Sequence, residues 1–386
     1  MTSAMEGTTQ DTHLLDYSTT WVTFTEIIFE AVPTTVFSTE VVIFLSVLVG
    51  VLVILTAGGN LLVVIAFATT PKLRTYNNYF ILGLAIADLL VAVVNMPLFA
   101  MVILLGYWPL GAIFCDMFSF MDHAFSHVSI ILVALISLDR YIAVTYPIRH
   151  RQYWRRRPRA ILIIAAGYII PVIIWLPLTS LWQVINGIDK RPIPDDVCTP
   201  LYHQSFVAFW FIIFLFGIIP FSITSVCCAR IYYALRRFYK GRLQLKMMIT
   251  EQTATNSIAG SSQNSGNPGT GSGKEEVSQV RKDGGANQSK VNSNIKPRIN
   301  QESIKGARTL FLIAIAMWIA WFPSLIVTIM IPFCPDCVPP VVYSAAIFWG
   351  YINSLLNPIC YALTDKAFKD GFIRIFTLKC FEKEQI

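Results

Sequence analysis

Long hydrophobic runs, each about as long as a membrane helix, recur along the chain. A helix needs about 20 mostly apolar residues to cross the hydrocarbon core of a bilayer. The pattern predicts an all-α membrane protein, a bundle of seven transmembrane helices with a short amphipathic helix at its C-terminal end. The seven runs lie at about 41–67, 78–104, 112–138, 160–180, 204–235, 305–331 and 341–363.

Basic residues in the short loops indicate which side of the membrane each loop occupies. Lys72 and Arg74 follow the first run, and six arginines within 149–159 follow the third. The alternate connections hold only Lys190 and Arg191 as cations. Because loops rich in Lys and Arg stay on the cytoplasmic side, we expect a multi-pass plasma-membrane protein with an extracellular N-terminus.

Five segments follow from these runs. Residues 1–40 are predicted as an extracellular N-terminal segment, and 41–237 as the first five transmembrane helices. Residues 238–303, rich in Ser, Asn and Gly, hold too few apolar side chains to compensate for chain entropy. They are predicted as a disordered third cytoplasmic loop. Helices six and seven occupy 304–363, and an amphipathic helix with the C-terminal tail occupies 364–386.

The C-terminal segment has the pattern of a helix at a membrane surface. Phe368, Phe372 and Phe376 recur every four residues among Lys and Arg side chains, as in a helix that lies in the interface. Cys380 follows this helix. It is either a site of lipidation by a palmitoyl chain or an ordinary free cysteine.

Composition excludes several classes of protein. With 55% hydrophobic and 14% charged residues, the chain is not a soluble globular protein. The formal net charge is +7, yet no Lys or Arg precedes Lys72, which indicates membrane asymmetry rather than a nucleic-acid-binding face. No nucleophile and base stand in a catalytic arrangement, so neither an enzyme nor a cofactor is expected.

Three ionisable positions inside the runs are candidates for function. A charged side chain within a membrane helix costs at least about 2.5–3.5 kcal/mol. Asp88, Asp122 and the pair Asp139–Arg140 are such positions. Asp122 and Arg140 are eighteen residues apart, which is five helical turns or roughly 27 Å on one face. One helix therefore carries an acid near its outer end and an arginine at its inner end.

Asp122 has two interpretations. It is either a carboxylate paired within the bundle or, since no Lys or Arg lies at its depth in the runs, a partner for an external cation. Aromatic rings would strengthen the binding of a cation, although aromatic residues also serve as packing. The candidate rings are those of Trp321, Phe348, Trp349 and Tyr351.

Asp88 lies in the middle of its run, and several other runs hold polar residues at a similar depth. Such a set either binds a sodium ion in a hydrated cluster or supplies hydrogen bonds between helices. No other metal site is expected. The other members are Asn60, Ser129, Asn353, Ser354 and Asn357.

Cysteines occur at two places on the outer side. Cys115 lies about two turns before Asp122, and Cys198 is the only cysteine of the second outer loop, so a disulfide between them would tie this loop over Asp122. Cys334 and Cys337 are predicted to form a loop disulfide rather than a redox motif, because no βαβ pattern surrounds them.

Six short motifs stand in order along the chain. They are GN at Gly59–Asn60, LAIAD ending at Asp88, YWPLG before Cys115, Asp139-Arg140-Tyr141, Trp321-Phe-Pro323 and Asn357-Pro358-Ile-Cys-Tyr361. With these motifs the chain resembles the rhodopsin-like (class A) G-protein-coupled receptors over about 41–378, apart from the long inner loop.

This resemblance implies roles for named residues. Trp321 would be the toggle of activation, and Ile148 would insert into the G protein. The sodium site would consist of Asp88, Ser129, Asn353 and Asn357. The switch at the inner face would consist of Asp139, Arg140, Tyr141 and Tyr361.

Within this family the chain is similar to aminergic receptors, with features of the muscarinic acetylcholine, dopamine and histamine receptors. Asp122 holds the position of the amine-binding acid, and 350–354 match the signature beside it. The resemblance implies that Tyr351 bonds the acid and that Ser126 lines the pocket.

The chain departs from the aminergic pattern at several pocket positions. Aminergic receptors commonly have aromatic residues at four positions that are occupied here by His123, Ser324, Leu325 and Phe348. The cage for acetylcholine is therefore incomplete. The fifth run has no hydroxyl between Ser205 and its proline to meet a catechol. His127 either bonds a ligand or packs within the bundle.

We therefore expect a receptor that binds an extracellular biogenic amine or acetylcholine-like ligand through Asp122 and activates heterotrimeric G proteins. Arrestin, a receptor kinase and membrane lipids are further expected partners, and nucleic acid is not. A receptor of the same fold for a peptide or lipid stays open as an alternative, and a transporter or channel is a more distant one.

Overall fold

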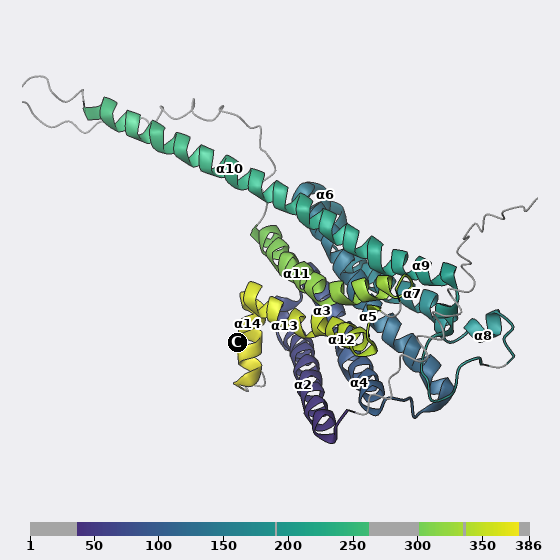
Figure 1. Cartoon of the computed structure of the whole chain (residues 1–386). Coiled ribbons are helices and arrows are strands. Elements are labelled where there is room, and N and C mark those ends of the chain that lie inside the picture. Colours follow the sequence, from purple (N-terminus) through teal and green to yellow (C-terminus); the bar gives the residue numbers. More distant parts are fainter. Residues whose placement is uncertain (1–36, 190, 262–300, 335–336, 378–386) are drawn as a thin grey trace, which may run out of the picture.

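The computed structural model describes residues 37–189, 191–261, 301–334 and 337–377. These residues form helices joined by turns and loops, and none of them lies in a strand (Figure 1). Six helices within them are long and apolar enough to cross a membrane. The predicted all-α fold class is confirmed. The six are Thr39–Thr69, Tyr76–Leu105, Gly111–Thr145, Arg157–Thr179, Phe206–Gln244 and Ile304–Met330.

The first two spans differ in regularity. Helix α2 (Thr39–Thr69) is continuous. The second span consists of α3 (Tyr76–Leu90), a π-helical turn η2 (Val91–Asn95) and α4 (Met96–Leu105). The turn directly precedes Pro97, whose nitrogen has no hydrogen to donate, and a wider turn accommodates the lost helical hydrogen bond.

Helix α5 (Gly111–Thr145) is the centre of the bundle. It packs against α3, α7 (Arg157–Thr179), α10 (Ile219–Ser261) and α11 (Gln301–Met330), and its middle residues are the most buried of the spans. Such a helix carries functional groups from the outer to the inner face without a break. This explains why Asp122 and Arg140 lie on one helix that touches most of the others.

The fifth span extends beyond the predicted membrane segment. It comprises α9 (Phe206–Ile212), the π-helical turn η5 (Ile213–Ile218) and α10 (Ile219–Ser261), which projects from the inner end of the bundle (Figure 1). The prediction of disorder from residue 238 is wrong for 238–261, because helix formers such as Leu, Lys, Met, Gln and Glu extend the helix despite their polarity. Residues 262–300 lie outside the described residues.

The seventh span is divided at the depth of the predicted site. Helix α11 (Gln301–Met330) passes through Pro323, whereas the next span consists of α12 (Pro340–Gly350) and α13 (Ile352–Thr364). The two pieces have 11 and 13 residues, so neither is long enough alone to cross the membrane. Together they cover the predicted run at 341–363.

Helix α14 (Lys366–Phe376) confirms the predicted amphipathic helix. Asp365 caps its start by accepting a hydrogen bond from the backbone of Ala367 at 2.9 Å. Phe368 is fully buried, with its ring centroid 5.8 Å from that of Tyr361, whereas Phe376 is exposed. The helix is therefore anchored to the bundle on one face and open on the other. Cys380 lies outside the described residues.

The remaining helical segments are short turns in the loops. They hold the connections close to the ends of the spans. They are η1 (Pro71–Leu73), α6 (Pro147–Arg149), η3 (His150–Trp154), α8 (Trp182–Ile185) and η4 (Leu201–Gln204).

Candidate functional site

A cavity of about 820 Å³ opens between the helices in the outer half of the bundle. All the spans contribute to its walls, but their inner ends do not. Most of the lining residues are apolar. Asp122 is the only Asp, Glu, Lys or Arg side chain that lines it within the described residues. The predicted acid therefore faces the interior of the bundle, and not lipid.

The carboxylate of Asp122 is bonded to the seventh span. The hydroxyl of Tyr351 donates to Oδ1 of Asp122 at 2.6 Å. Tyr351 stands at the junction of α12 and α13, and the rings of Phe99 and Phe348 contact it edge-on at 5.7 and 5.8 Å. These rings fix the phenol, so the acid has one neutral donor in a preset position.

Asn95 holds the other side of this helix segment. Its Nδ2 donates to the carbonyl oxygen of Asp122 at 3.0 Å and to Oγ of Ser126 at 3.2 Å. The sequence analysis did not single out Asn95. The available signal was its position as a buried amide just before Pro97, since a polar residue at this depth needs a partner in another span.

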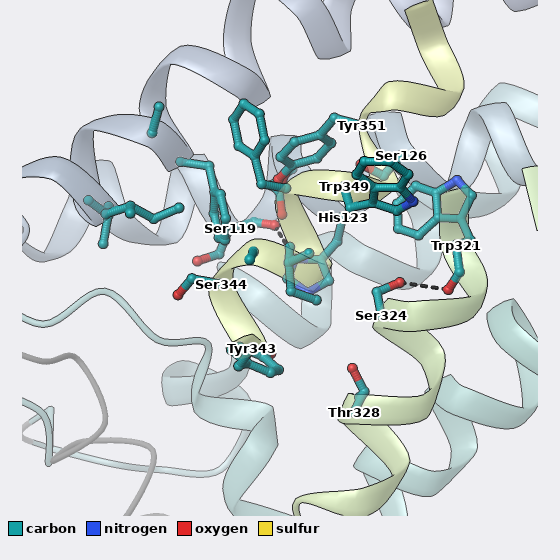
Figure 2. A pocket seen from close by; sticks show the side chains of 18 of the residues that line it. Ser119, His123, Ser126, Trp321, Ser324, Thr328, Tyr343, Ser344, Trp349 and Tyr351 are labelled. Carbon is teal, nitrogen blue, oxygen red and sulfur yellow. Dashed lines mark hydrogen bonds between the residues drawn. The ribbon is translucent and has the colours of Figure 1, made fainter. Parts of the chain in front are cut away.

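Trp321 lies at the floor of the cavity, close to α12. A Cβ atom at Gly350 would lie 3.0 Å from two carbons of the indole, so glycine allows the ring to pack directly on that helix. Ser324 turns back to its own helix and donates to the Trp321 carbonyl oxygen at 2.8 Å (Figure 2). Leu325 packs against the cluster formed by Phe209, Ile213 and Ile331.

Trp349 is the least enclosed of the predicted aromatic residues. Its side chain is 45% exposed, and Nε1 donates to the carbonyl oxygen of Ile319 at 3.0 Å. Phe348 and Tyr351, together with Trp321, lie deeper in the lining. These three rings therefore share the cavity wall with Asp122.

His123 belongs to an aromatic cluster on the opposite wall. Its Nδ1 lies 2.7 Å from the Ser119 carbonyl oxygen, and its ring packs on Trp175 with centroids 4.3 Å apart. Tyr202, in η4 outside the spans, lies 3.2 Å from Nε2 of His123. Burial raises the pKa of Tyr202 well above its usual value, so its hydroxyl stays protonated. This hydroxyl donates a hydrogen bond to Nε2 of His123.

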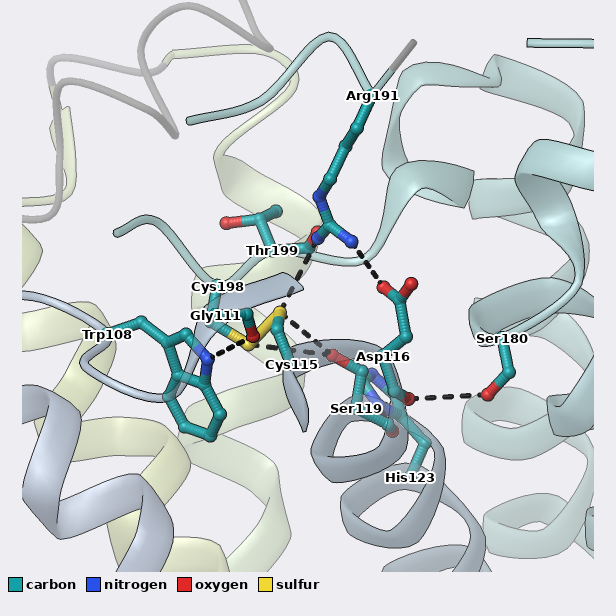
Figure 3. Close-up of a disulfide and its surroundings, with 10 residues drawn as sticks. All are labelled: Trp108, Gly111, Cys115, Asp116, Ser119, His123, Ser180, Arg191, Cys198 and Thr199. Atoms are coloured by element: carbon teal, nitrogen blue, oxygen red, sulfur yellow. Dashed lines mark hydrogen bonds and ion pairs between the residues drawn. A yellow bond between two sulfur atoms is a disulfide. The ribbon is translucent and has the colours of Figure 1, made fainter. Parts of the chain in front are cut away.

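The second outer loop is tied to the top of α5. The predicted disulfide between Cys115 and Cys198 is present, with a Cα–Cα distance of 5.3 Å. Nη1 of Arg191 pairs with Oδ1 of Asp116 at 2.6 Å, next to the disulfide (Figure 3). These links hold the loop residue Thr199 in the cavity wall.

The predicted loop disulfide between Cys334 and Cys337 is also present. It closes the connection between α11 and α12, with a Cα–Cα distance of 5.3 Å. The last turn of α11 and the start of α12 are therefore tied close to each other.

Asp88 is fully buried among the polar residues predicted to surround it. Oδ1 accepts hydrogen bonds from Ser129 at 3.0 Å and Ser354 at 2.8 Å, and Oδ2 accepts one from Asn357 at 2.7 Å. Asn353 reaches Ser129 at 3.5 Å. The Oδ1 atoms of both asparagines are buried and have no hydrogen-bond partner in the part of the chain that the structure describes. A carboxylate beside unpaired amide oxygens fits the ligand preference of a hard cation.

At the inner end, Arg140 pairs with the adjacent Asp139 and donates to Oδ1 of Asn77 at 2.6 Å. Asp139 also accepts a hydrogen bond from the hydroxyl of Tyr76 at 2.8 Å, and Nε2 of His150 lies 3.0 Å from it. Sequence reasoning found the Asp139–Arg140 pair but missed these partners, which lie 63 positions away or in a loop.

The other residues of the predicted switch occupy the inner half. Tyr141 is half-buried against the inner core, and Tyr361 is fully buried, with no hydrogen-bond partner for its hydroxyl among the described residues. Ile148 is 65% exposed in α6, at the turn after α5. An apolar side chain so exposed at the inner face is available for contact with another protein.

Comparison with known proteins agrees with this architecture. The family model of the 7 transmembrane receptor (rhodopsin family) matches residues 59–361. The chain is 27% identical to the muscarinic acetylcholine receptor M1 of Homo sapiens, over 86% of this chain and 88% of that protein. It is 28% identical to the alpha-1A adrenergic receptor of Oryctolagus cuniculus, over 89% of this chain and 70% of that protein.

A third relative is the muscarinic acetylcholine receptor M4 of Gallus gallus, 25% identical over 88% of this chain and 90% of that protein. All three are named as receptors, which agrees with the prediction that the chain is not an enzyme. The match of the family model includes Asp122, Tyr351 and the inner switch. The chain therefore belongs to the rhodopsin family of seven-transmembrane receptors, as a class A G-protein-coupled receptor of the aminergic type.

Proposed function

We propose that this receptor binds an extracellular cationic amine through Asp122. One observation carries the proposal: the carboxylate lies in a mostly apolar cavity and, within the described residues, meets the hydroxyl of Tyr351 and no Lys or Arg side chain. A carboxylate without its own counter-ion favours an incoming ammonium, because ion pairing compensates a charge in a poorly solvated site. We also propose that the N-terminus is extracellular, which places the cavity on the extracellular side of the membrane.

Aromatic rings support the same ligand class. Trp321, Phe348 and Tyr351 line the cavity around the acid. The face of an aromatic ring attracts a cation by roughly 0.5–2 kcal/mol, depending on how far the site is desolvated. An ammonium bound to Asp122 would therefore gain from the ion pair and from the rings together.

The proposed signal passes from the cavity to the inner face. Because Trp321 of α11 packs directly on Gly350 of α12, a ligand at this contact acts on both helices. A ligand shifts the receptor between two states only by its difference in affinity for them, about 1.4 kcal/mol for each tenfold change in population. We propose that Arg140, Tyr361 and Ile148 then engage a heterotrimeric G protein. Arrestin, a receptor kinase and membrane lipids stay predicted partners.

A panel of ligands tests this function. Cells that express the receptor with a promiscuous G protein would be exposed to biogenic amines and acetylcholine, each beside a neutral analogue of the same shape. At least one cation should signal, and its neutral analogue should not. Equal responses to a cation and its neutral analogue would instead favour the alternative of a lipid or peptide ligand.

Tyr351→Phe should lower the affinity of the active amine by about tenfold. The variant removes the 2.6 Å hydrogen bond that positions Asp122, and a bond to a charged group contributes roughly 1.5–3 kcal/mol. The affinity would be measured by amine binding to purified receptor. Tyr343→Phe is the matched control, because this second tyrosine lines the cavity without a hydrogen bond to the acid. Equal losses in both variants would contradict the role of Tyr351.

Asp88→Asn should abolish any effect of sodium on agonist potency. In the native receptor, replacing KCl by NaCl at constant ionic strength is expected to lower potency severalfold, since a cation at Asp88 favours one arrangement of the helices. The measurement is a pair of concentration–response curves on permeabilised membranes. A sodium effect that persists in the variant would place the ion elsewhere.

A further inference from the structure

His127 lies in the same cavity as Asp122 but deeper in the bundle. It follows Asp122 by five residues on α5, which corresponds to about 7.5 Å along the helix axis. Its ring lies 4.6 Å from that of Phe216 and 5.1 Å from that of Trp175, and parallel to that of His123 at 6.2 Å. These contacts fix the plane of the imidazole.

The backbone determines which nitrogen of His127 carries the proton. Nδ1 lies 2.6 Å from the carbonyl oxygen of His123. A carbonyl oxygen only accepts hydrogen bonds, so Nδ1 is the donor, and in a neutral imidazole Nε2 is then an acceptor. No carboxylate lies within ion-pair distance of His127 in the described part of the chain.

This acceptor has no partner in the protein. Nε2 of His127 makes no hydrogen bond within the described residues, and it is not enclosed by protein atoms either. Nε2 of His123, by contrast, accepts a hydrogen bond from the hydroxyl of Tyr202. The surroundings of the His127 ring are aromatic, so a ligand that fills this space without a donor would leave a buried acceptor unsatisfied.

We propose that Nε2 of His127 accepts a hydrogen bond from the ligand, which therefore carries a donor roughly 7 Å from its ammonium group. This inference rests on the proposed function of Asp122. It selects arylalkylamines with a phenolic hydroxyl over esters of choline, which have no donor. The fifth span, whose lining residues Phe209, Ile212, Ile213 and Phe216 are apolar, supplies no competing polar contact here.

Two pairs of probes test the inference. Tyramine differs from phenethylamine, and serotonin from tryptamine, only by one hydroxyl group. Their dissociation constants would be measured on the purified full-length receptor in lipid nanodiscs. In at least one pair the hydroxylated amine should bind about tenfold more tightly to the native receptor. This preference should fall to about onefold in His127→Phe, whose ring retains the packing on Trp175 and Phe216.

Two more variants control this result. His127→Gln retains an acceptor oxygen and should keep part of the preference. His203→Phe should keep all of it, because this second histidine of the cavity wall lies in η4 of the outer loop and not below Asp122 on α5. Burial lowers the pKa of His203 to about 3, so this control changes no charge at neutral pH. Thermal unfolding of each purified variant would verify its fold.

The outcomes separate this inference from the proposed function. If Asp122→Asn abolishes binding of all four amines, but neither pair shows a preference or the preference survives in His127→Phe, only the inference about His127 is overturned. If Asp122→Asn leaves binding unchanged, or no amine binds at all, the proposed function fails and this inference fails with it.

Discussion

Asp122→Asn should lower the potency of amine agonists by about thirtyfold or more while the receptor still reaches the cell surface. The change removes the negative charge but leaves the shape of the side chain. It also leaves an oxygen that accepts a hydrogen bond from the Tyr351 hydroxyl, as Oδ1 of Asp122 does at 2.6 Å. Losing one partner of a buried charge pair costs about 2–5 kcal/mol of binding free energy, and each 1.4 kcal/mol is a factor of ten.

The fold should tolerate this substitution. In the unliganded cavity the carboxylate has one hydroxyl partner and no counter-ion from the described residues, so replacing it by an amide lowers the desolvation cost. Concentration–response curves and surface labelling of the same cells would measure both effects. Asp116→Asn is the matched control, because this carboxylate lies on the same helix, pairs with Arg191 and does not line the cavity. We expect a change of threefold or less there.

Native potency in Asp122→Asn would exclude an ion pair at this position. Parallel losses in Asp116→Asn and Asp122→Asn would instead indicate a general effect of charge on the outer end of α5. If Asp122→Asn loses both surface labelling and potency, binding of the same amine would be measured on purified Asp122→Asn and Asp116→Asn receptors. That measurement decides whether Asp122 pairs with the amine.

Gly306→Val should raise ligand-independent signalling severalfold. A Cβ atom at Gly306 of α11 would lie 2.8 Å from Nη1 and 3.1 Å from Cδ of Arg140. Arg140 has limited freedom to move away, because Asp139 and Asn77 hold its guanidinium group. The larger valine side chain therefore does not fit while α11 lies against Arg140.

The expected increase follows from the difference between two arrangements of α11. Inserting a side chain into a filled contact costs about 1–3 kcal/mol, and the cost disappears when the helix moves away from Arg140. The population of that second arrangement should then rise by about tenfold for each 1.4 kcal/mol. Basal G-protein activity, normalised to the amount of receptor at the surface, measures this shift.

Gly58→Val in α2 is the matched control, because a Cβ atom at Gly58 would meet nothing within 4 Å. Both variants place a β-branched residue inside a helix, so any effect of helix propensity is common to them. Equal basal activity in Gly306→Val, Gly58→Val and the native receptor would show that the contact with Arg140 does not restrain α11.

Most of the helix boundaries were predictable from the sequence. The first run, predicted at about 41–67, is the helix Thr39–Thr69, and the fourth, at about 160–180, is Arg157–Thr179. This agreement has a local cause, since a backbone in lipid must form its hydrogen bonds within a helix of sufficient length. The end of α10 at Ser261 was missed, because hydropathy does not report helix propensity in polar segments.

The candidate site was predictable in part. Asp122, Asp88 and the Asp139–Arg140 pair stand out because charged residues are rare inside hydrophobic runs. Some of the hydrogen-bond partners on other helices do not stand out in the sequence. Asn95 and Asn77 are ordinary polar residues in sequence, and only the rotation of α3 and η2 against α5 brings them within hydrogen-bond distance of this helix.

The sequence alone determined the number of spans, the expected direction of the chain and the presence of one acid at the depth of the outer half, because each depends on the composition of a single segment. The tertiary structure alone decided that Tyr351 donates to Asp122 from 229 positions away, that Nε2 of His127 has no partner, and that Gly306 lies against Arg140. These contacts depend on how helices rotate and pack against each other, which the periodicity of one helix does not specify.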